Sequence, residues 1–301
     1  MKRIHPSGGH LIVTGASGFL GRAVVTQAQA QGLRVTALTR SDVDLRDPLA
    51  LAAVIARTTP DMAIDAAGVV PGPSNPDFAE NTVLTQGWLD ALDRVPQPPR
   101  LVLAGSAAVY GDGAAQHRAT RETDPMLPTS AYGRAKLLSL DLAVAACVQR
   151  GCDVQTGIVF NLIGEGQPPH MVPRVFIERA LAAKNGRLEV GHCGDVRDFM
   201  HISDAADALI AMATHGVKGD VLNIATGRPT KISEVLDIIC GSVGVAWHSQ
   251  PDSDGLRADH VCYGDSTLLQ ERTGWRQQFN LETALLRAVQ AARHQNRRFQ
   301  V

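Results

Sequence analysis

The sequence predicts an α/β fold, a doubly wound parallel sheet followed by a smaller C-terminal α/β lobe. Short β-branched runs alternate with longer helical patterns over the first 160 residues, and this alternation is typical of a parallel sheet covered by helices on both faces. A glycine-rich turn follows the first run, and the 301 residues exceed the usual size of one domain. We therefore expect one domain over residues 1–163 and a second lobe over residues 164–301, some of whose segments return to the first domain.

Strands and helices are expected to alternate along the first domain. The predicted strands cover residues 11–14, 34–38, 62–66, 100–104 and 154–160. The predicted helices between them cover residues 20–31, 48–58, 77–95 and 130–150. After a Gly/Pro-rich turn we expect a helix, then strands at 188–191 and 221–225 and helices at 203–214, 232–241 and 281–294. Right-handed crossovers wind such a sheet in both directions, so ligands should bind at the carboxyl ends of its strands.

Composition and charge argue against several classes of partner. Hydrophobic residues make up 45% of the chain and charged residues 20%, and the net charge of −1 offers no field that would attract nucleic acid or an anionic membrane. The five cysteines form no C-x-x-C pair and are odd in number. This favours reduced thiols in a cytoplasmic protein over a disulfide framework or a metal site. The short apolar stretch near the N-terminus predicts neither a signal peptide nor a membrane span.

The turn after the first predicted strand carries the spacing G-x-x-G-x-x-G at Gly15, Gly18 and Gly21. Glycines let the backbone turn tightly and approach a pyrophosphate, and the N-terminus of the following helix supplies N–H donors and a positive dipole end. A glycine-rich connection without a ligand is the alternative interpretation. The position directly after the first strand favours a Rossmann-like dinucleotide site, whose contacts would also come from Ser17, Phe19 and Leu20.

The end of the second predicted strand indicates which dinucleotide is bound. A carboxylate there would bind the ribose 2′-hydroxyl of NAD and repel a 2′-phosphate, whereas Arg40 presents a planar fork that suits a 2′-phosphate. NADP(H) is therefore favoured, and NAD(H) is possible because Arg40 could instead face solvent beside Asp42. Further cofactor contacts are expected from Asp44, Leu45, Ala66, Ala67, Gly68 and Val159.

A candidate catalytic pair lies in the predicted helix 130–150. Tyr132 and Lys136 are one helical turn apart and share a face of that helix. A tyrosine, whose pKa is ordinarily about 10, becomes an acid–base group near neutral pH when a neighbouring cation stabilises its phenolate. Ser106 follows the fourth strand, and its hydroxyl could hold a substrate oxygen against Tyr132. A surface pair is the alternative, but the distance from the glycine turn and from Ser106 favours catalysis.

These motifs resemble the extended short-chain dehydrogenases/reductases that modify nucleotide sugars. The matching segments cover nearly the whole chain in the family's order, and they include residues 14–21, 106–111, 132–136, 160–164, 197–199, 223–227 and 265–275. The resemblance implies that Ser106, Tyr132 and Lys136 form a catalytic trio and that Tyr132 and Lys136 also contact the cofactor. It further implies a homodimer through a four-helix bundle that pairs the helices 77–95 and 130–150 across a two-fold axis.

The same resemblance implies which residues would bind a sugar nucleotide. Two guanidinium groups and an amide, from Arg197, Arg257 and Asn161, would suit its diphosphate. Arg197 could alternatively pair with Asp195 or Asp198, and Asp198 is expected to serve structure. The remaining candidate substrate contacts are Ser106, Ala107, His170 and Val190; His170 could be a surface histidine, and a short core strand would also explain Val190.

The resemblance leaves several reactions open, and the residues beside Ser106 narrow them. Dehydratases of the family usually carry an Asp-Glu pair where this chain has Ala107 and Ala108, and decarboxylating members usually carry a glutamate in that segment. Arg40 disfavours an epimerase with tightly held NAD, because such enzymes usually show an acid at that position. We expect NADPH-dependent reduction of a 4-keto-6-deoxy hexose on GDP or dTDP, with Tyr132 as the proton donor. An epimerase and a non-catalytic dinucleotide sensor are the alternatives.

Overall fold

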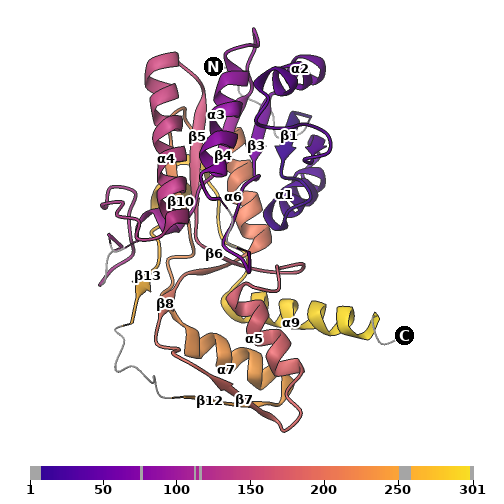
Figure 1. Cartoon of the computed structure of the whole chain (residues 1–301), viewed down its shortest axis with the longest axis vertical. Coiled ribbons are helices and arrows are strands. Elements are labelled where there is room, and N and C mark those ends of the chain that lie inside the picture. The colour runs from indigo at the N-terminus through magenta and orange to yellow at the C-terminus, as the bar shows by residue number, and fades with distance from the viewer. Residues whose placement is uncertain (1–7, 75–76, 112, 115–116, 251–258, 299–301) are drawn as a thin grey trace.

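The computed structural model describes residues 8–74, 77–111, 113–114, 117–250 and 259–298. Within them, the central sheet has six parallel strands in the order β10-β5-β4-β3-β1-β2 (Figure 1). The strands are β1 (His10–Thr14), β2 (Arg34–Leu38), β3 (Met62–Asp65), β4 (Arg100–Ala104), β5 (Val154–Val159) and β10 (Val221–Ile224). The chain runs from β1 to β2 on one side and then returns to β3 on the other, so the order reverses between β1 and β3. The predicted doubly wound fold is confirmed, and a ligand crevice is expected at that reversal.

Helices cover both faces of this sheet. The helices α2 (Pro48–Thr58), α3 (Glu80–Leu92) and α4 (Ala131–Ala145) pack on one face, and α1 (Phe19–Ala30) and α6 (Ile202–His215) pack on the other. Successive side chains of a strand point to opposite faces. In β1, Ile12 therefore belongs to the core under α2 and α3, whereas Leu11 and Val13 belong to the core under α1 and α6.

A second lobe lies below the sheet in Figure 1. Its core joins α5 (Val172–Leu181), α7 (Ile232–Val243) and α9 (Leu281–Arg298) to the paired strands β7 (Arg187–Val190) and β12 (Ala246–Ser249). Short strands connect the lobe to the sheet: β6 (Asn161–Ile163) pairs with β9 (Phe199–His201), and β8 (Val196–Arg197) pairs with β11 (Thr230–Lys231) and β13 (Val261–Cys262).

Part of the second half of the chain packs with the sheet rather than with the lower lobe. Helix α6 packs against α1, β10 forms the sheet edge beside β5, and α8 (Thr267–Thr273) packs against α6. All five cysteines are free thiols. Among the described helices, we find none that combines the length and the apolar character needed to cross a membrane.

Several predicted boundaries are wrong. The helix predicted over 77–95 is α3 alone, because Asp77 accepts a hydrogen bond from the Ala79 amide and forms a turn before the helix. The helix predicted over 130–150 is α-helical only to Ala145, and the turn Ala146–Arg150 is π-helical. Several short elements were not predicted, and most of them have only two or three residues, too few to display a hydrophobic period. The unpredicted elements are β6, β8, β9, β11, β12, β13, α8 and the 3-10 turn Ala107–Val109.

Candidate active site

The glycine turn between β1 and α1 fits tightly against the end of β3. Gly15 has φ +67°, and a Cβ there would lie 2.6 Å from the backbone of Ala66. The Gly18 amide donates to the Gly15 carbonyl at 2.9 Å, and no side chain caps the start of α1. The first N–H groups of α1 therefore remain available for an anion, in a cradle that side chains at Gly15 and Gly21 would fill.

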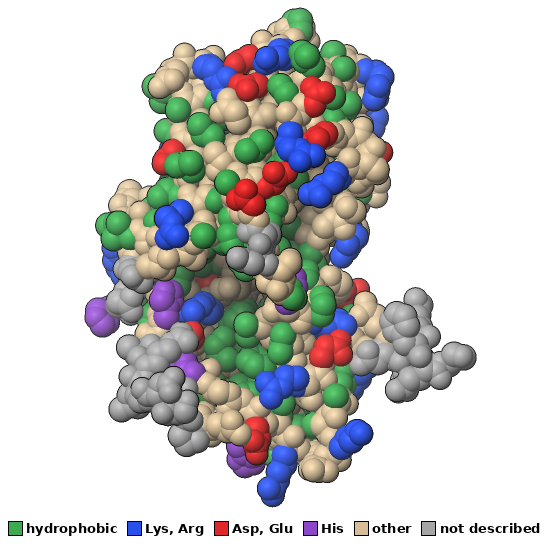
Figure 2. All heavy atoms as spheres, viewed as in Figure 1, with side chains coloured by type: hydrophobic (Ala, Val, Ile, Leu, Met, Phe, Trp, Pro, Cys, Tyr) green, Lys and Arg blue, Asp and Glu red, His purple; other side chains and the backbone are tan. Residues whose placement is uncertain are grey.

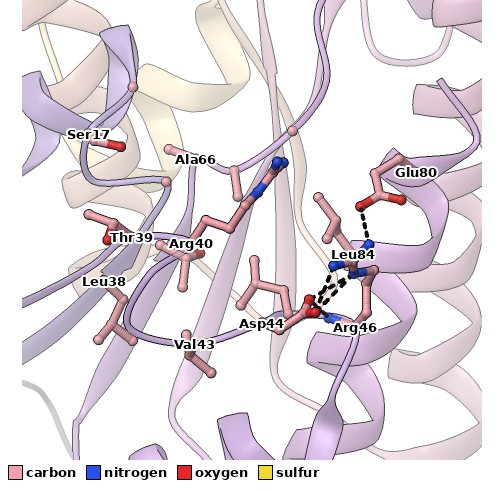
Figure 3. Close-up of a pocket in the computed structure, with 16 residues that line it drawn as sticks. Ser17, Leu38, Thr39, Arg40, Val43, Asp44, Arg46, Ala66, Glu80 and Leu84 are labelled. Carbon is pink, nitrogen blue, oxygen red and sulfur yellow. Dashed lines mark hydrogen bonds and ion pairs between the residues drawn. The ribbon is translucent and has the colours of Figure 1, made fainter. Parts of the chain in front are cut away.

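Arg40 extends into the pocket that opens beside this turn (Figure 3). Its side chain is exposed, and within the described residues no hydrogen bond or ion pair holds its guanidinium. Asp42 is engaged elsewhere, because its carboxylate accepts hydrogen bonds from the Thr39 amide at 2.8 Å and the Thr39 hydroxyl at 2.6 Å. These hydrogen bonds lower the pKa of Asp42. Asp42 thus shapes the turn after β2 and leaves Arg40 free to bind an anion.

The other side of the same pocket contains a second arginine that is already neutralised. Arg46 forms an ion pair with Asp44 at 2.8 Å and lies 3.9 Å from Glu80 of α3. The Arg46 guanidinium lowers the pKa of Asp44 to about 2. In Figure 3 these three side chains face one another, apart from Arg40. The pocket therefore offers one uncommitted cation and one that is matched by two carboxylates.

Most of the predicted cofactor residues line this pocket, and some do not. The lining contains Gly15, Ser17, Gly18, Arg40, Asp44, Leu45, Ala66, Ala67 and Gly68. It does not contain Phe19, Leu20, Val159, Tyr132 or Lys136. Phe19 and Leu20 open α1, and Val159 is buried in the core under α1 and α6. Further lining residues were not predicted from the sequence: Thr14, Leu38, Thr39, Val43, Arg46, Glu80 and Leu84. Several of them lie close to Gly15 or Arg40 in the sequence, which was a usable signal.

The structure brings Ser106 close to the start of α4. Ser106 caps the 3-10 turn that follows β4, and its Oγ accepts from the Ala108 amide at 3.2 Å. Gly133, next to Tyr132, packs so closely on this turn that a Cβ would collide with the Ala108 carbonyl. Only glycine allows that approach. The candidate trio therefore meets at the carboxyl edge of the sheet, with Tyr132 and Lys136 one turn apart on α4.

Each member of the Tyr132–Lys136 pair has a contact that restricts its position. Lys136 Nζ donates to the Ala104 carbonyl at the end of β4, at 3.1 Å. The Phe78 ring meets the Tyr132 ring edge-on, with 5.6 Å between the centroids. Phe78 lies in the segment between β3 and α3, which Asn81 anchors through two hydrogen bonds with Val69. No sequence motif pointed to Phe78, because its contact depends on how α3 and α4 pack.

The predicted diphosphate residues do not form a free cationic cluster in the described part of the chain. Arg197 pairs with Asp195 at 3.0 Å and donates to the His260 carbonyl at 2.6 Å. Asn161 is exposed but its amide donates to the Asp198 carbonyl at 3.0 Å. Arg257 lies outside the described residues. In the structure Arg197 therefore forms the ion pair with Asp195 that was the alternative to a free diphosphate-binding group.

Asp198 has a structural role, as expected from the sequence. It is fully buried, and its carboxylate accepts hydrogen bonds from the amides of Thr226 and Gly227 at 2.9 and 3.0 Å. Burial raises its pKa to about 6. Val190 is 4% exposed and belongs to the core of the lower lobe, so it cannot line an open pocket without rearrangement. His170 is half-buried in the turn before α5, close to Gly72 of the segment after β3.

The surface is hollowed between the sheet and the lower lobe, and the floor of this hollow consists largely of hydrophobic side chains (Figure 2). A dinucleotide cradle on a parallel sheet, with Ser106, Tyr132 and Lys136 at the same edge, defines the class of extended short-chain dehydrogenases/reductases. The chain belongs to the NAD dependent epimerase/dehydratase family, which it matches over residues 11–225.

Relatives of known activity are similar over most of the chain. The sequence is 28% identical to dTDP-6-deoxy-L-talose 4-dehydrogenase (NAD(P)(+)) of Kitasatospora kifunensis, over 93% of this chain and 95% of that one. It is 26% identical to GDP-6-deoxy-D-mannose reductase of Pseudomonas aeruginosa, over 91% and 94% of the two chains. It is 33% identical to dTDP-4-dehydrorhamnose reductase of Mycobacterium tuberculosis, over 71% and 69%.

The structure is similar to that of RMD from Pseudomonas aeruginosa complexed with NADPH. The TM-score is 0.84 at 25% identity, over 95% of this chain and 99% of that one. Thermus thermophilus UDP-glucose 4-epimerase complexed with NAD shares the fold, with a TM-score of 0.80 at 24% identity, over 94% and 99% of the chains. The resemblance to extended short-chain dehydrogenases/reductases is confirmed.

Proposed function

We propose that this protein reduces a 4-keto-6-deoxy hexose carried on a nucleoside diphosphate, with NADPH as the reductant. The observation that carries the proposal is the approach of the Ser106 turn to the start of α4, where Gly133, next to Tyr132, packs against that turn at the carboxyl edge of the sheet. The relatives that support it include a GDP-6-deoxy-D-mannose reductase and a dTDP-4-dehydrorhamnose reductase.

The cofactor proposal rests on the pocket after β2. The first N–H groups of α1 would hold the pyrophosphate, and the apolar side chains of Leu38, Leu45 and Leu84 would hold the adenine. Arg40 would bind the 2′-phosphate as a bidentate partner, since among the described residues no hydrogen bond or ion pair holds its guanidinium and Asp42 is committed to Thr39. NADP(H) is favoured on this ground. The name of one relative gives both NAD and NADP as its cofactors, so NAD(H) is the alternative cofactor.

In the proposed reaction, protein groups handle the proton and the developing charge. NADPH, held by the pocket after β2, would supply the hydride for the C4 ketone. Tyr132 donates its phenolic proton to the ketone oxygen as that oxygen gains negative charge. Ser106 donates a hydrogen bond to the same oxygen, since its Oγ acts as an acceptor toward Ala108 and keeps its proton free. Lys136, fixed on the Ala104 carbonyl, stabilises the phenolate that remains.

The side chains next to Ser106 favour simple reduction over elimination. Water can leave C5 and C6 of a sugar only if an acid and a base lie beside the ring. Ala107 and Ala108 occupy the turn that Ser106 caps, and neither can transfer a proton. The lower lobe would hold the nucleotide of the substrate, although Val190 is in its core and Arg197 would have to exchange Asp195 for a phosphate.

The test follows NADPH absorbance with a panel of 4-keto-6-deoxy sugars on GDP and dTDP. We expect oxidation of NADPH with at least one of them. Tyr132→Phe removes the proton donor, so turnover should fall by a factor of about 1,000 or more while the Kd for NADPH stays within about twofold.

Phe78→Leu serves as the control for packing around Tyr132, since it disturbs the ring contact without removing a proton. Retained turnover in Tyr132→Phe would remove the tyrosine from the mechanism. Interconversion of two sugar nucleotides without NADPH oxidation would identify an epimerase instead.

A further inference from the structure

Asp65 is a buried carboxylate at the carboxyl end of β3, and the proposed reaction gives it no role. It is 5% exposed. Its Oδ1 accepts hydrogen bonds from the Thr14 hydroxyl at 2.6 Å and from the Ala67 amide at 3.0 Å. Trp88 of α3 donates in turn to the Thr14 oxygen at 3.3 Å. Thr14 and Ala67 both line the cofactor pocket, so this carboxylate lies directly behind its wall.

Asp65 and Lys136 lie on the same face and at the same edge of the sheet. Ala63 and Trp88 belong to the core under α2, α3 and α4, so Asp65, two residues after Ala63, points to that face. Helix α4, which carries Lys136, packs there. Asp65 is in register with Leu103 of β4, and Lys136 Nζ donates to the carbonyl of the next residue, Ala104. A Cβ at Gly68, three residues after Asp65, would lie 3.4 Å from Lys136 Nζ.

The positive charge of Lys136 acts on Asp65 across this edge of the sheet. Burial raises the pKa of Asp65, and the hydrogen bonds from Thr14 and Ala67 together with the positive charge of Lys136 oppose that rise. The charged side chains that line the cofactor pocket in front of Asp65 are Arg40, Asp44 and Arg46 after β2 and Glu80 of α3. They are more exposed than Asp65, and Arg46 pairs with both acids, so solvent and mutual neutralisation weaken their effect.

We propose that Asp65 is a positioning residue for the Tyr132–Lys136 pair: its buried carboxylate attracts the Lys136 ammonium and thereby favours the protonated form of the Tyr132 phenol. This inference rests on the proposed function, in which Tyr132 transfers that proton. A negative charge behind Lys136 offsets part of the lysine field that stabilises the phenolate. The carboxylate therefore favours the protonated phenol over the phenolate, which suits a proton donor.

Ultraviolet titration of tyrosine tests this without any substrate. The chain has three tyrosines. Burial raises the pKa of Tyr110 strongly, well above the usual range of a tyrosine. The difference between wild type and Tyr132→Phe assigns the Tyr132 signal. In Asp65→Asn, which keeps an oxygen acceptor for Thr14, we expect the Tyr132 midpoint to fall by about half a pH unit or more.

The matched control is Asp61→Asn. Asp61 precedes β3 at the opposite end of the strand and accepts the His10 amide at 2.8 Å. This variant should leave the Tyr132 midpoint unchanged. If Asp65→Asn does not fold, Asp65→Ser keeps a neutral acceptor and carries the same expectation. An unchanged midpoint in a folded variant of either kind would overturn the inference, because a purely structural Asp65 does not influence Tyr132.

Activity gives an independent second reading. In the ketone-reduction direction, the alkaline limb of the kcat/KM profile of Asp65→Asn should move to lower pH, as the phenol becomes easier to ionise. If no keto sugar is reduced, the proposed function fails but the titration still decides the role of Asp65. If reduction occurs and the titration shows no shift, the proposed function stands and the inference fails.

Discussion

At the residue scale, the pocket after β2 shows why two arginines of similar position differ in what they can bind. Arg40 and Arg46 both line it. Asp44 and Glu80 neutralise Arg46, whereas Asp42 is held by Thr39 and leaves Arg40 uncommitted. An arginine that must first release a carboxylate gains less from a phosphate, because one ion pair replaces another.

We expect Arg40→Ala to weaken binding of NADP by about 10- to 100-fold and binding of NAD by less than about threefold, since the lost contacts are hydrogen bonds to a charged phosphate. Titration of each cofactor by intrinsic fluorescence or calorimetry measures both constants. Arg46→Ala is the matched control and should change the NADP-to-NAD ratio little. Equal losses for the two cofactors in Arg40→Ala would contradict a role at the 2′-phosphate.

Residues of the candidate substrate site were harder to predict than those of the cofactor site. Arg40 follows directly from its place after a strand, but the partners of Arg197 are Asp195 and the carbonyl of His260, which is far along the chain. Whether Arg197 is free depends on the pairing of β8 with β13. Strands of two residues are too short to show a hydrophobic period, so the sequence does not predict them.

At the element scale, the start of α6 joins the sheet to the segment before α9. His201 caps α6, since its Nδ1 accepts the Ser203 amide at 3.2 Å. Its ring packs on Phe279 with 4.3 Å between the centroids, and Asp204 accepts the Phe279 amide at 3.0 Å. Burial, with Arg287 nearby, lowers the pKa of His201 to about 4. The imidazole is therefore neutral in the folded protein at neutral pH.

We expect His201 to make the fold less stable in acid. In the unfolded chain a histidine takes up a proton below about pH 6.5, whereas folded His201 resists protonation to about pH 4. The unfolded state thus binds more protons between these values, and stability is lost as the pH falls through that window. From pH 7 to pH 4.5 this linkage amounts to roughly 2 to 3 kcal/mol.

Urea unfolding at the two pH values measures this difference. His201→Asn keeps an acceptor for the Ser203 amide, because asparagine is a good N-cap, and it does not titrate. Between pH 7 and pH 4.5 the variant should lose roughly 2 to 3 kcal/mol less of its free energy of unfolding than the wild type loses. His215→Asn is the control, because it removes a histidine from the exposed end of the same helix and should leave this pH dependence unchanged. An identical pH dependence in wild type and His201→Asn would rule out the assignment.

At the scale of the whole molecule, α3 and α4 present apolar side chains away from the sheet. Val83 of α3 is 45% exposed, Leu138 of α4 is 55% exposed, and Val148 of the π-helical turn is 80% exposed. A cluster of exposed apolar side chains is typical of an interface. These are the two helices for which a homodimer through a four-helix bundle was expected, and the dimer stays a prediction.

The combined substitution of Leu138→Glu and Val148→Glu should convert a dimer to monomers, because it would bury four like charges in the interface. Light scattering behind size exclusion should show the mass fall from that of two chains to that of one. Leu49→Glu on α2 is the control, since Leu49 is 68% exposed but lies outside these two helices. A wild type with the mass of one chain would refute the dimer.

The sequence by itself determined the parallel sheet, the glycine turn and the Tyr132–Lys136 pair. Each is a local pattern, so the strand periods, the spacing of glycines and the i, i+4 relation fix it without knowledge of distant contacts. Only the tertiary structure placed Asp65 behind the cofactor pocket, set Phe78 against Tyr132 and paired Arg197 with Asp195. The first two depend on how α3 and α4 pack on one face of the sheet. The last depends on the pairing of β8 with β13, which brings the His260 carbonyl to Arg197.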